Sequence, residues 1–303
     1  MFHYKAFNLH LSVPFECPEL IEIDKKENEL DLISVYYTSS LPEKLDNFTN
    51  SGPTFTSNKN QFLLNTKADV KFLVINGNKI YIDLGEDCTI EQMKLLFFSS
   101  VMAALFMQKK MLVFHASTIN INDKAVLFCG DSGLGKSTIS ETLVKQGYKK
   151  LSDDMSVIYY NNEKQKIMCI PSYPQSKLWE ESINLLNIDT NGLKHVHNRL
   201  NKYLVTNKES FYHKELPVEK IYILSINNKQ NVLLNDIDKL KAIYEIENQT
   251  FRKKFYIKDE YRKNYFNLFV KIVEQATIKH LSRPYKTNSI SEIKNILNND
   301  LNG

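Results

Sequence analysis

The chain has 303 residues, of which 43% are hydrophobic, and this is enough for one large domain or two smaller ones. The net charge of +4 is modest and argues neither for nor against nucleic acid, and the short basic clusters at 252–254 and 262–263 are interpreted as solvated helix faces, so no nucleic-acid partner is expected. The four cysteines lie far apart without a C-x-x-C pair, which disfavours a disulfide framework or a zinc site and favours a cytoplasmic protein.

Residues 1–88 read as a β-rich region. Short runs of β-branched and aromatic residues alternate with turn residues, and Asn76-Gly77-Asn78 between two apolar runs predicts a hairpin. The expected strands are Tyr4–Val13, Leu32–Tyr37, Phe62–Leu64, Val70–Ile75 and Lys79–Leu84. This region carries no recognisable chemistry, and we interpret it as a scaffold or cover.

A helix is expected after the capping box formed by Thr89 and Gln92, and it should run through Met107. Its apolar character on all sides predicts burial. The most apolar part, Leu95–Met107, is too short for a membrane span and is interrupted by two serines, so no membrane association is expected. The N-terminus also lacks the apolar core of a signal peptide.

The central feature of the sequence is Gly130–Ser137, which fits the phosphate-binding loop pattern G-x-x-x-x-G-K-[ST]. The apolar run Lys124–Cys129 before it predicts a buried parallel strand, and Thr138–Gln146 after it predicts a helix. Backbone N–H groups and the helix dipole favour an anion at such a junction. Lys136 could then reach the outer phosphates of a nucleotide, and Ser137 could hold Mg²⁺.

Two further features could carry chemistry. His115 ends an expected strand, Met111–Phe114, just before the strand Ala116–Ile121. Parallel sheets place ligand sites at strand ends, but a lone histidine is more often structural. Asp153 and Asp154 precede an expected strand and could bind Mg²⁺ or orient an acceptor hydroxyl, although an ordinary Asp-Asp turn has the same pattern. Both readings stay open on spacing alone.

The rest of the chain alternates between loops, helices and strands. We expect an ordered loop at Pro171–Trp179 and a polar, irregular segment at 189–215 that orders over an acceptor. A strand is expected at Ile221–Ile226. The expected helices are 180–186, 240–246, 261–280 and 289–297.

Taken together, Phe114–Ser117, Gly130–Ser137 and Leu151–Asp154 resemble the catalytic core of the HPr kinase/phosphorylase family in order and spacing. The resemblance implies an α/β fold with a phosphoenolpyruvate carboxykinase/HPr kinase-like P-loop core, a β-rich N-terminal part at 1–88, and a kinase domain at 89–303 with a helical C-terminal part. A weaker resemblance, through Pro171–Pro174, Lys177–Trp179 and Arg283-Pro284, extends to HPr-kinase-related proteins of peptide natural-product clusters. The Gly-Arg-Asn-Leu-Ala-type segment of HPr kinases is not apparent.

The resemblance also implies roles for individual residues. Asp153 acts as the general base, His115 tunes the carboxylate pair, and Lys136 is catalytic. Ser137 and Asp154 hold Mg²⁺. The residues implied in nucleotide binding are Gly130, Asp131, Ser132, Gly133, Leu134, Gly135, Lys136, Ser137 and Thr138.

The sequence therefore predicts a kinase that uses ATP and Mg²⁺ to phosphorylate a serine of a peptide or small protein, with a ribosomal-peptide natural-product precursor as one acceptor class. The alternatives are a small-molecule kinase and a P-loop ATPase with a regulatory role. A non-catalytic binding module is disfavoured because Lys136 and both aspartates are present. The acceptor, the phosphoryl donor, a reverse phosphorylase reaction, a homo-oligomer and the division of roles between the aspartates stay open.

Overall fold

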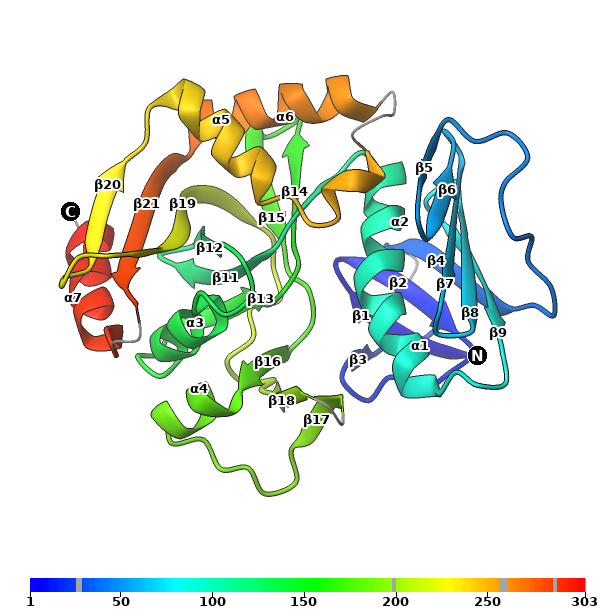
Figure 1. The fold of residues 1–303 in the computed structure, drawn as a ribbon, viewed down its shortest axis with the longest axis horizontal. Coiled ribbons are helices and arrows are strands. Elements are labelled where there is room, and N and C mark those ends of the chain that lie inside the picture. The colour runs from blue at the N-terminus through cyan, green and yellow to red at the C-terminus, as the bar shows by residue number, and fades with distance from the viewer. Residues whose placement is uncertain (26–28, 198–199, 257–260, 286–287, 303) are drawn as a thin grey trace. The chain divides into compact units, whose positions relative to one another are not determined.

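The computed structural model describes residues 1–25, 29–197, 200–256, 261–285 and 288–302 (Figure 1). The fold is mixed α/β with β-rich sheets and a helical C-terminal part, as the sequence predicts. The chain forms two compact units, the first from 1–113 and 250–268 and the second from 114–249 and 269–303. The sequence regions 1–88 and 89–303 divide the chain at a single point, whereas each compact unit combines two separate segments. The division into these two regions stays a prediction.

The first unit contains a sheet with the strand order β3-β1-β2-β4-β9-β8-β7-β6-β5. Its strands are β1 (Phe2–Ala6), β2 (Leu9–Val13), β3 (Ile21–Glu22), β4 (Asp31–Tyr37), β5 (Asn50–Gly52), β6 (Phe55–Ser57), β7 (Gln61–Thr66), β8 (Val70–Ile75) and β9 (Lys79–Leu84). The hairpin predicted at Asn76-Gly77 is confirmed, with φ of 52° and 64° at these two residues. The expected single strand Tyr4–Val13 is wrong, because Phe7 and Asn8 adopt φ of 54° and 53° and turn the chain between β1 and β2.

The predicted buried helix of this unit is confirmed. It runs through α1 (Ile90–Leu96), the π-helical turn η1 (Phe97–Val101) and α2 (Met102–Gln108), and the capping box of Thr89 and Gln92 is formed on both sides. In the described part of the chain, the 19-residue helix Ile90–Gln108 is the one segment long and apolar enough to cross a membrane, and 61% of its most apolar window is buried inside the protein. A buried core helix meets the same criteria, and the cytoplasmic location stays a prediction.

The second unit is built on a sheet with the order β14-β15-β19-β12-β11-β13, to which β21 adds beside β19 and β20 beside β21. A separate small sheet has the order β16-β18-β17. The strands are β11 (Ala116–Ile121), β12 (Lys124–Cys129), β13 (Lys149–Ser152), β14 (Ser156–Asn161), β15 (Lys166–Ile170), β16 (Gln175–Trp179), β17 (Lys194–His197), β18 (Leu200–Thr206), β19 (Leu216–Asn227), β20 (Leu233–Asp236) and β21 (Thr277–Pro284).

The other elements complete the chain. Strand β10 (Leu112–Phe114) ends at the boundary between the units. The remaining helices are α3 (Lys136–Val144), α4 (Glu180–Leu185), α5 (Lys239–Asn248), the 3₁₀ turn η2 (Lys253–Phe255), α6 (Tyr261–Gln275) and α7 (Ile290–Asn302).

Three expectations are wrong where distant partners decide the local structure. The expected loop at Pro171–Trp179 contains β16, and the segment 189–215 is irregular only in part, because it contains β17 and β18 and β18 pairs with both β16 and β17. The helix expected to reach His280 ends at Gln275, and β21 follows, paired in parallel with β19. Strand formation depends on cross-strand neighbours, so local sequence predicts it poorly.

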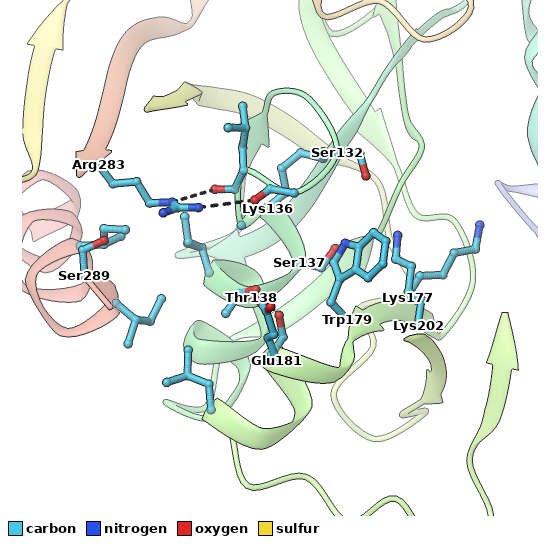
Figure 2. A pocket seen from close by; sticks show the side chains of 18 of the residues that line it. Ser132, Lys136, Ser137, Thr138, Lys177, Trp179, Glu181, Lys202, Arg283 and Ser289 are labelled. Atoms are coloured by element: carbon cyan, nitrogen blue, oxygen red, sulfur yellow. Dashed lines mark hydrogen bonds between the residues drawn. The ribbon is translucent and has the colours of Figure 1, made fainter. Parts of the chain in front are cut away.

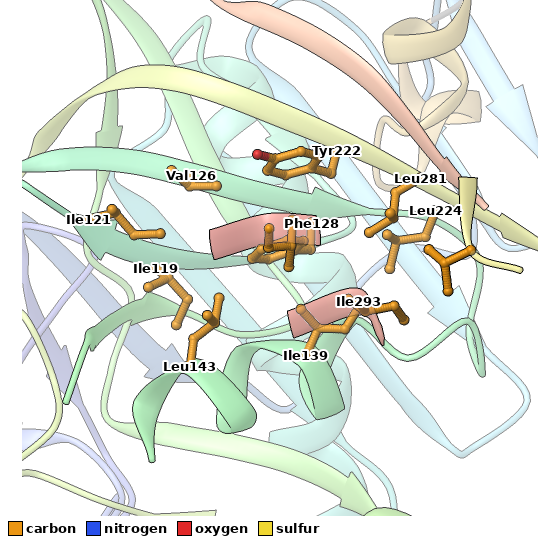
Figure 3. Close-up of a cluster of buried hydrophobic side chains, with 12 residues drawn as sticks. Ile119, Ile121, Val126, Phe128, Ile139, Leu143, Tyr222, Leu224, Leu281 and Ile293 are labelled. Carbon is orange, nitrogen blue, oxygen red and sulfur yellow. The ribbon is translucent and has the colours of Figure 1, made fainter. Parts of the chain in front are cut away.

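A buried cluster holds the glycine-rich loop in place in the second unit (Figure 3). Strand β12 pairs in parallel with β19, as the sequence predicts, and the rings of Phe128 and Tyr222 stack with centroids 5.4 Å apart. Ile139 and Leu143 of α3 pack against this layer. The start of α3 is therefore fixed relative to the end of β12, where the loop leaves the sheet.

A polar cluster attaches α7 to the same sheet. Asp300 accepts hydrogen bonds from Lys279 at 2.5 Å and from Tyr222 at 2.6 Å, and it also pairs with Lys220. Burial raises the pKa of this carboxyl, but the bonds from Lys279, Tyr222 and Lys220 outweigh burial and leave the pKa below its usual range.

We predict that Asp300→Ala lowers the free energy of unfolding by about 1–3 kcal/mol at pH 7, because the buried Tyr222 and two partly buried lysines lose their acceptor. The contribution of an acid with a lowered folded pKa is complete above its ordinary value of 3.8 and is lost as the pH falls through the folded pKa. The difference between wild type and variant in urea unfolding should therefore shrink below that pH.

Asp236→Ala is the matched control, because Asp236 pairs with the same lysine at 3.3 Å but its side chain is 85% exposed. It should cost no more than about 0.5 kcal/mol. Equal losses in the two variants would contradict the role given to Asp300.

Candidate functional site

The loop between β12 and α3 has a backbone that requires glycine at several positions. Gly130, Gly133 and Gly135 adopt φ of +149°, +88° and +100°. A Cβ on Gly130 would also lie 3.0 Å from the Leu134 side chain and 3.2 Å from Leu224, whereas Gly133 and Gly135 have open space around them. Backbone conformation alone favours glycine at 133 and 135, whereas both backbone conformation and close packing favour glycine at 130.

Lys136 begins α3 and is 6% exposed. Its ammonium group donates hydrogen bonds to the carbonyl oxygens of Gly130 at 2.8 Å and Asp131 at 3.0 Å. Burial lowers the pKa of Lys136, while the nearby carboxylates of Asp154 and Asp153 oppose this shift. The loop thus curls around a cation that lies at the N-terminus of a helix, a place where anions are favoured.

Asp153 connects the loop to its surroundings and is 8% exposed. It follows β13, and its carboxylate accepts a hydrogen bond from Ser137 Oγ at 2.9 Å and another from Ser117 Oγ of β11. Its Oδ2 also accepts from the backbone N–H of Lys177 in β16 at 2.9 Å. One carboxylate therefore ties the start of α3 to β11, β13 and β16.

Asp154 has a different environment, although it is the next residue. Its φ of +65° is left-handed and turns its side chain away from the direction it would take in a continuing strand. The side chain is 26% exposed, with Lys177 Nζ 2.8 Å from Oδ2 and His115 Nε2 3.8 Å from Oδ1. Two adjacent carboxylates can thus serve one region only because the chain bends between them.

The pKa of Asp154 lies well below its usual range. Burial alone would raise it, but the positive charge of Lys177, the nearby His115 side chain and the charge of Lys202 outweigh burial. The pKa of Lys177 is raised in turn, because the attraction of Asp154 exceeds the effect of burial. The two side chains form an ion pair beside the loop.

A cavity of about 900 Å³ opens along these residues (Figure 2). Its wall includes residues 132–139, His115, Asp154 and Lys177, while β18 contributes Lys202. Arg283, at the end of β21, also lines the cavity, and its guanidinium donates to the carbonyl oxygens of Leu134 and Gly133 at 3.4 Å. Asp153 lies behind this wall, and Asp154 lies in it.

The structure brings together most of the residues singled out in the sequence. Ser132, Gly133, Leu134, Gly135, Lys136, Ser137, Thr138, His115 and Asp154 line the cavity, and Asp153 contacts Ser137. Gly130 and Asp131 contribute carbonyl oxygens to Lys136. The roles given to these residues stay predictions.

Sequence reasoning gave no role to Lys177 and Arg283. Lys177 fell in an expected loop and Arg283 beyond an expected helix, so no periodicity related either residue to the glycine-rich loop. In the sequence, both residues were named only among those that carry the weaker resemblance to HPr-kinase-related proteins. Contacts across 24 residues for Lys177 and about 150 for Arg283 come from the sheets and are not visible in the sequence.

The site has the donors that Mg²⁺ prefers. Among the described residues, no group of three or more His, Cys, Asp or Glu side chains is arranged to hold a metal by itself. Mg²⁺ commonly takes one or two carboxylates and completes its shell with water and substrate phosphates. Ser137 Oγ and Asp153, 2.9 Å apart, with Asp154 beside them in the chain, fit this requirement.

Comparison with known proteins agrees with the motif. Residues 107–241 match the family model described as the HPr Serine kinase C-terminal domain. This segment, somewhat less than half of the chain, is similar to that domain. The predicted family resemblance is thereby confirmed.

Curated relatives match over a shorter range. The HPr kinase/phosphorylase of Limosilactobacillus reuteri, in strains DSM 20016 and JCM 1112, is 28% identical over 76 residues, which cover 25% of this chain and 24% of each relative. The chain thus matches about a quarter of the length of these relatives. The structure of the Hpr(Ser) kinase/phosphatase from Coxiella burnetii matches 62% of this chain and 95% of its own chain at 14% identity, with a TM-score of 0.33.

We predict that Gly130→Ala destabilises the protein by roughly 1–3 kcal/mol more than Gly192→Ala, as measured by chemical unfolding. Gly192 has a φ of +78° with nothing near its Cβ position, so it measures the cost of a positive φ without close packing. Equal effects would mean that packing against Leu134 and Leu224 does not constrain the loop.

Proposed function

We propose that this chain is a kinase that transfers the γ-phosphoryl group of ATP to a serine hydroxyl of a peptide or small protein, with Mg²⁺ as its cofactor. The observation that carries the proposal is the convergence of Lys136, Ser137 and the two aspartates at the N-terminus of α3, beside one cavity. A helix N-terminus, a buried ammonium group and a carboxylate pair are the parts that phosphoryl transfer needs.

The loop would hold the phosphates of the donor. Its left-handed glycines and the first turn of α3 offer backbone N–H groups that helix hydrogen bonds do not use. Lys136 would exchange its bonds to the carbonyls of Gly130 and Asp131 for phosphate oxygens, which form stronger charge-assisted hydrogen bonds. This arrangement supports the predicted P-loop core.

Ser137 and Asp153 would hold the metal. Ser137 Oγ already donates to Asp153, so a cation that replaces this proton contact meets two oxygen ligands in place. Mg²⁺, when bound, would neutralise the charge that develops on the phosphates. The further bonds from Ser117 and the Lys177 backbone keep the Asp153 carboxylate fixed.

Asp154 would act on the acceptor, because it lines the cavity and Asp153 does not. This exchanges the roles that the sequence resemblance implied for the two residues. The acceptor serine oxygen attacks the γ-phosphorus, the bond from phosphorus to the bridging oxygen breaks, and ADP leaves. The serine proton passes to the Asp154 carboxylate, and His115 at 3.8 Å orients that carboxylate.

The acceptor class rests on the sequence resemblance, and a ribosomal-peptide precursor is the acceptor we favour. The location of β18 within the segment 189–215 supports an acceptor there, since Asn201 and Lys202 of that strand line the cavity. A small-molecule kinase or a regulatory ATPase would use the same donor site. The peptide kinase and the ATPase differ in the product that carries the phosphate.

We predict that the wild-type protein, incubated with Mg·ATP and an arrayed library of serine-containing peptides, yields phosphopeptides detected by mass spectrometry. Lys136→Ala should lower the rate by about 100-fold or more while the protein still unfolds cooperatively. Release of inorganic phosphate without any phosphopeptide would favour the ATPase, and no turnover of ATP at all would contradict the kinase.

The roles proposed for the two aspartates predict different kinetic effects for their asparagine variants. Asp153→Asn should raise the Mg²⁺ concentration needed for half-maximal rate, because a metal ligand loses its charge. Asp154→Asn should lower the maximal rate by about 100-fold or more at saturating Mg²⁺. The opposite pattern in a Mg²⁺ titration would restore Asp153 to the base role.

A further inference from the structure

Lys177 forms an ion pair with Asp154 beside the glycine-rich loop. The function proposed above gives the Lys177 side chain no role. Lys177 is half-buried, with its ammonium group 2.8 Å from Asp154 Oδ2 and its backbone N–H 2.9 Å from Asp153 Oδ2. It is thus in contact with both members of the acidic pair. An ion pair costs desolvation and is weak evidence for a stabilising role alone, so its location beside the loop calls for another explanation.

The cavity has a basic side chain on each side of the glycine-rich loop. Figure 2 shows Lys177 on the opposite side of Ser137 from Arg283, and both line the cavity. The loop and Lys136 lie between these two ends. A nucleotide whose β- and γ-phosphates contact Lys136 and Ser137 would therefore direct its terminal phosphoryl group toward Lys177 if its nucleoside lies toward Arg283.

We propose that Lys177 is a second phosphate-binding cation, which exchanges Asp154 for the oxygens of the terminal phosphoryl group when Mg·ATP binds. The proposal rests on the kinase function proposed above and adds a residue to its donor site. Lys177 would distinguish ATP from ADP, since ADP has no group that reaches it. Its departure from Asp154 would also free that carboxylate for the acceptor hydroxyl.

The charges around the pair are consistent with this exchange. Asp153 stays compensated by its hydrogen bonds from Ser117 and the Lys177 backbone, and the cation would replace its bond from Ser137, so only Asp154 loses a partner. His115, at 3.8 Å from Asp154, remains beside it. The backbone bond to Asp153 fixes the start of the Lys177 side chain, so the ammonium group moves at the end of a flexible stem while β16 stays in place.

Binding of Mg·ATP and Mg·ADP tests the proposal without an identified acceptor. Isothermal titration calorimetry gives both dissociation constants, and fluorescence of Trp179 gives a second reading, because it is the one tryptophan of the sequence and lines the cavity. We expect Lys177→Met to weaken Mg·ATP binding about tenfold and to change Mg·ADP binding less than about twofold. Lys177→Arg should recover most of the loss, because it keeps the charge.

Two further variants keep the test decisive. Lys124→Met removes a lysine from another ion pair, with Glu219 at 2.9 Å, and should change neither constant. Lys177→Met could fail to fold because it leaves the charge of Asp154 unpaired. The double variant Lys177→Met with Asp154→Asn removes that charge. Compared with Asp154→Asn alone, it should show the same loss of preference for Mg·ATP over Mg·ADP.

The outcomes separate this proposal from the kinase function. Equal weakening of Mg·ATP and Mg·ADP, or no weakening of either, would overturn the role of Lys177 and leave the kinase intact. A wild-type protein that binds neither nucleotide would overturn both.

Discussion

The hydrogen bond between Ser137 and the carboxylate of Asp153 is the contact on which the site depends. It joins the first turn of α3 to the bend after β13, and the same carboxylate accepts bonds from β11 and β16. Four elements that are separate in the sequence meet at one buried acid. Without it, the glycine-rich loop would be attached to the sheet through its own strand and helix and through the bonds from Arg283.

The neighbouring acid has a different environment because the backbone turns between the two. Asp153 is saturated with donors and buried, whereas the left-handed Asp154 faces the cavity with one cation and one histidine beside it. Identical side chains are thus given different electrostatic environments by a single backbone angle. This division is the reason for assigning one to the metal and the other to the acceptor.

Local signals in the sequence predicted the parts of the fold that local forces decide. The capping box of Thr89, the positive φ of Asn76-Gly77 and the strand, loop and helix around Gly130–Ser137 all involve residues that are close in sequence. The turn at Phe7-Asn8 escaped prediction because phenylalanine rarely adopts a left-handed conformation. Strands β16, β18 and β21 escaped because their partners are distant.

The same limit applies to the site. The motif predicted which residues would lie at the loop, and the contact of Ser137 with Asp153 brings the acidic pair to it. Lys177 and Arg283 could not be predicted to meet the loop, because sheet pairing brings them there and no spacing in the sequence encodes that pairing. Their contacts with Asp154 and with the loop carbonyls are what the structure adds.

The most direct test of this account is a crystal structure of the protein with Mg²⁺ and a non-hydrolysable ATP analogue. We expect the phosphates to lie against the backbone N–H groups of the loop and Mg²⁺ to lie about 2.0–2.1 Å from Ser137 Oγ. An analogue bound elsewhere, or a metal out of reach of both Ser137 and Asp153, would contradict it.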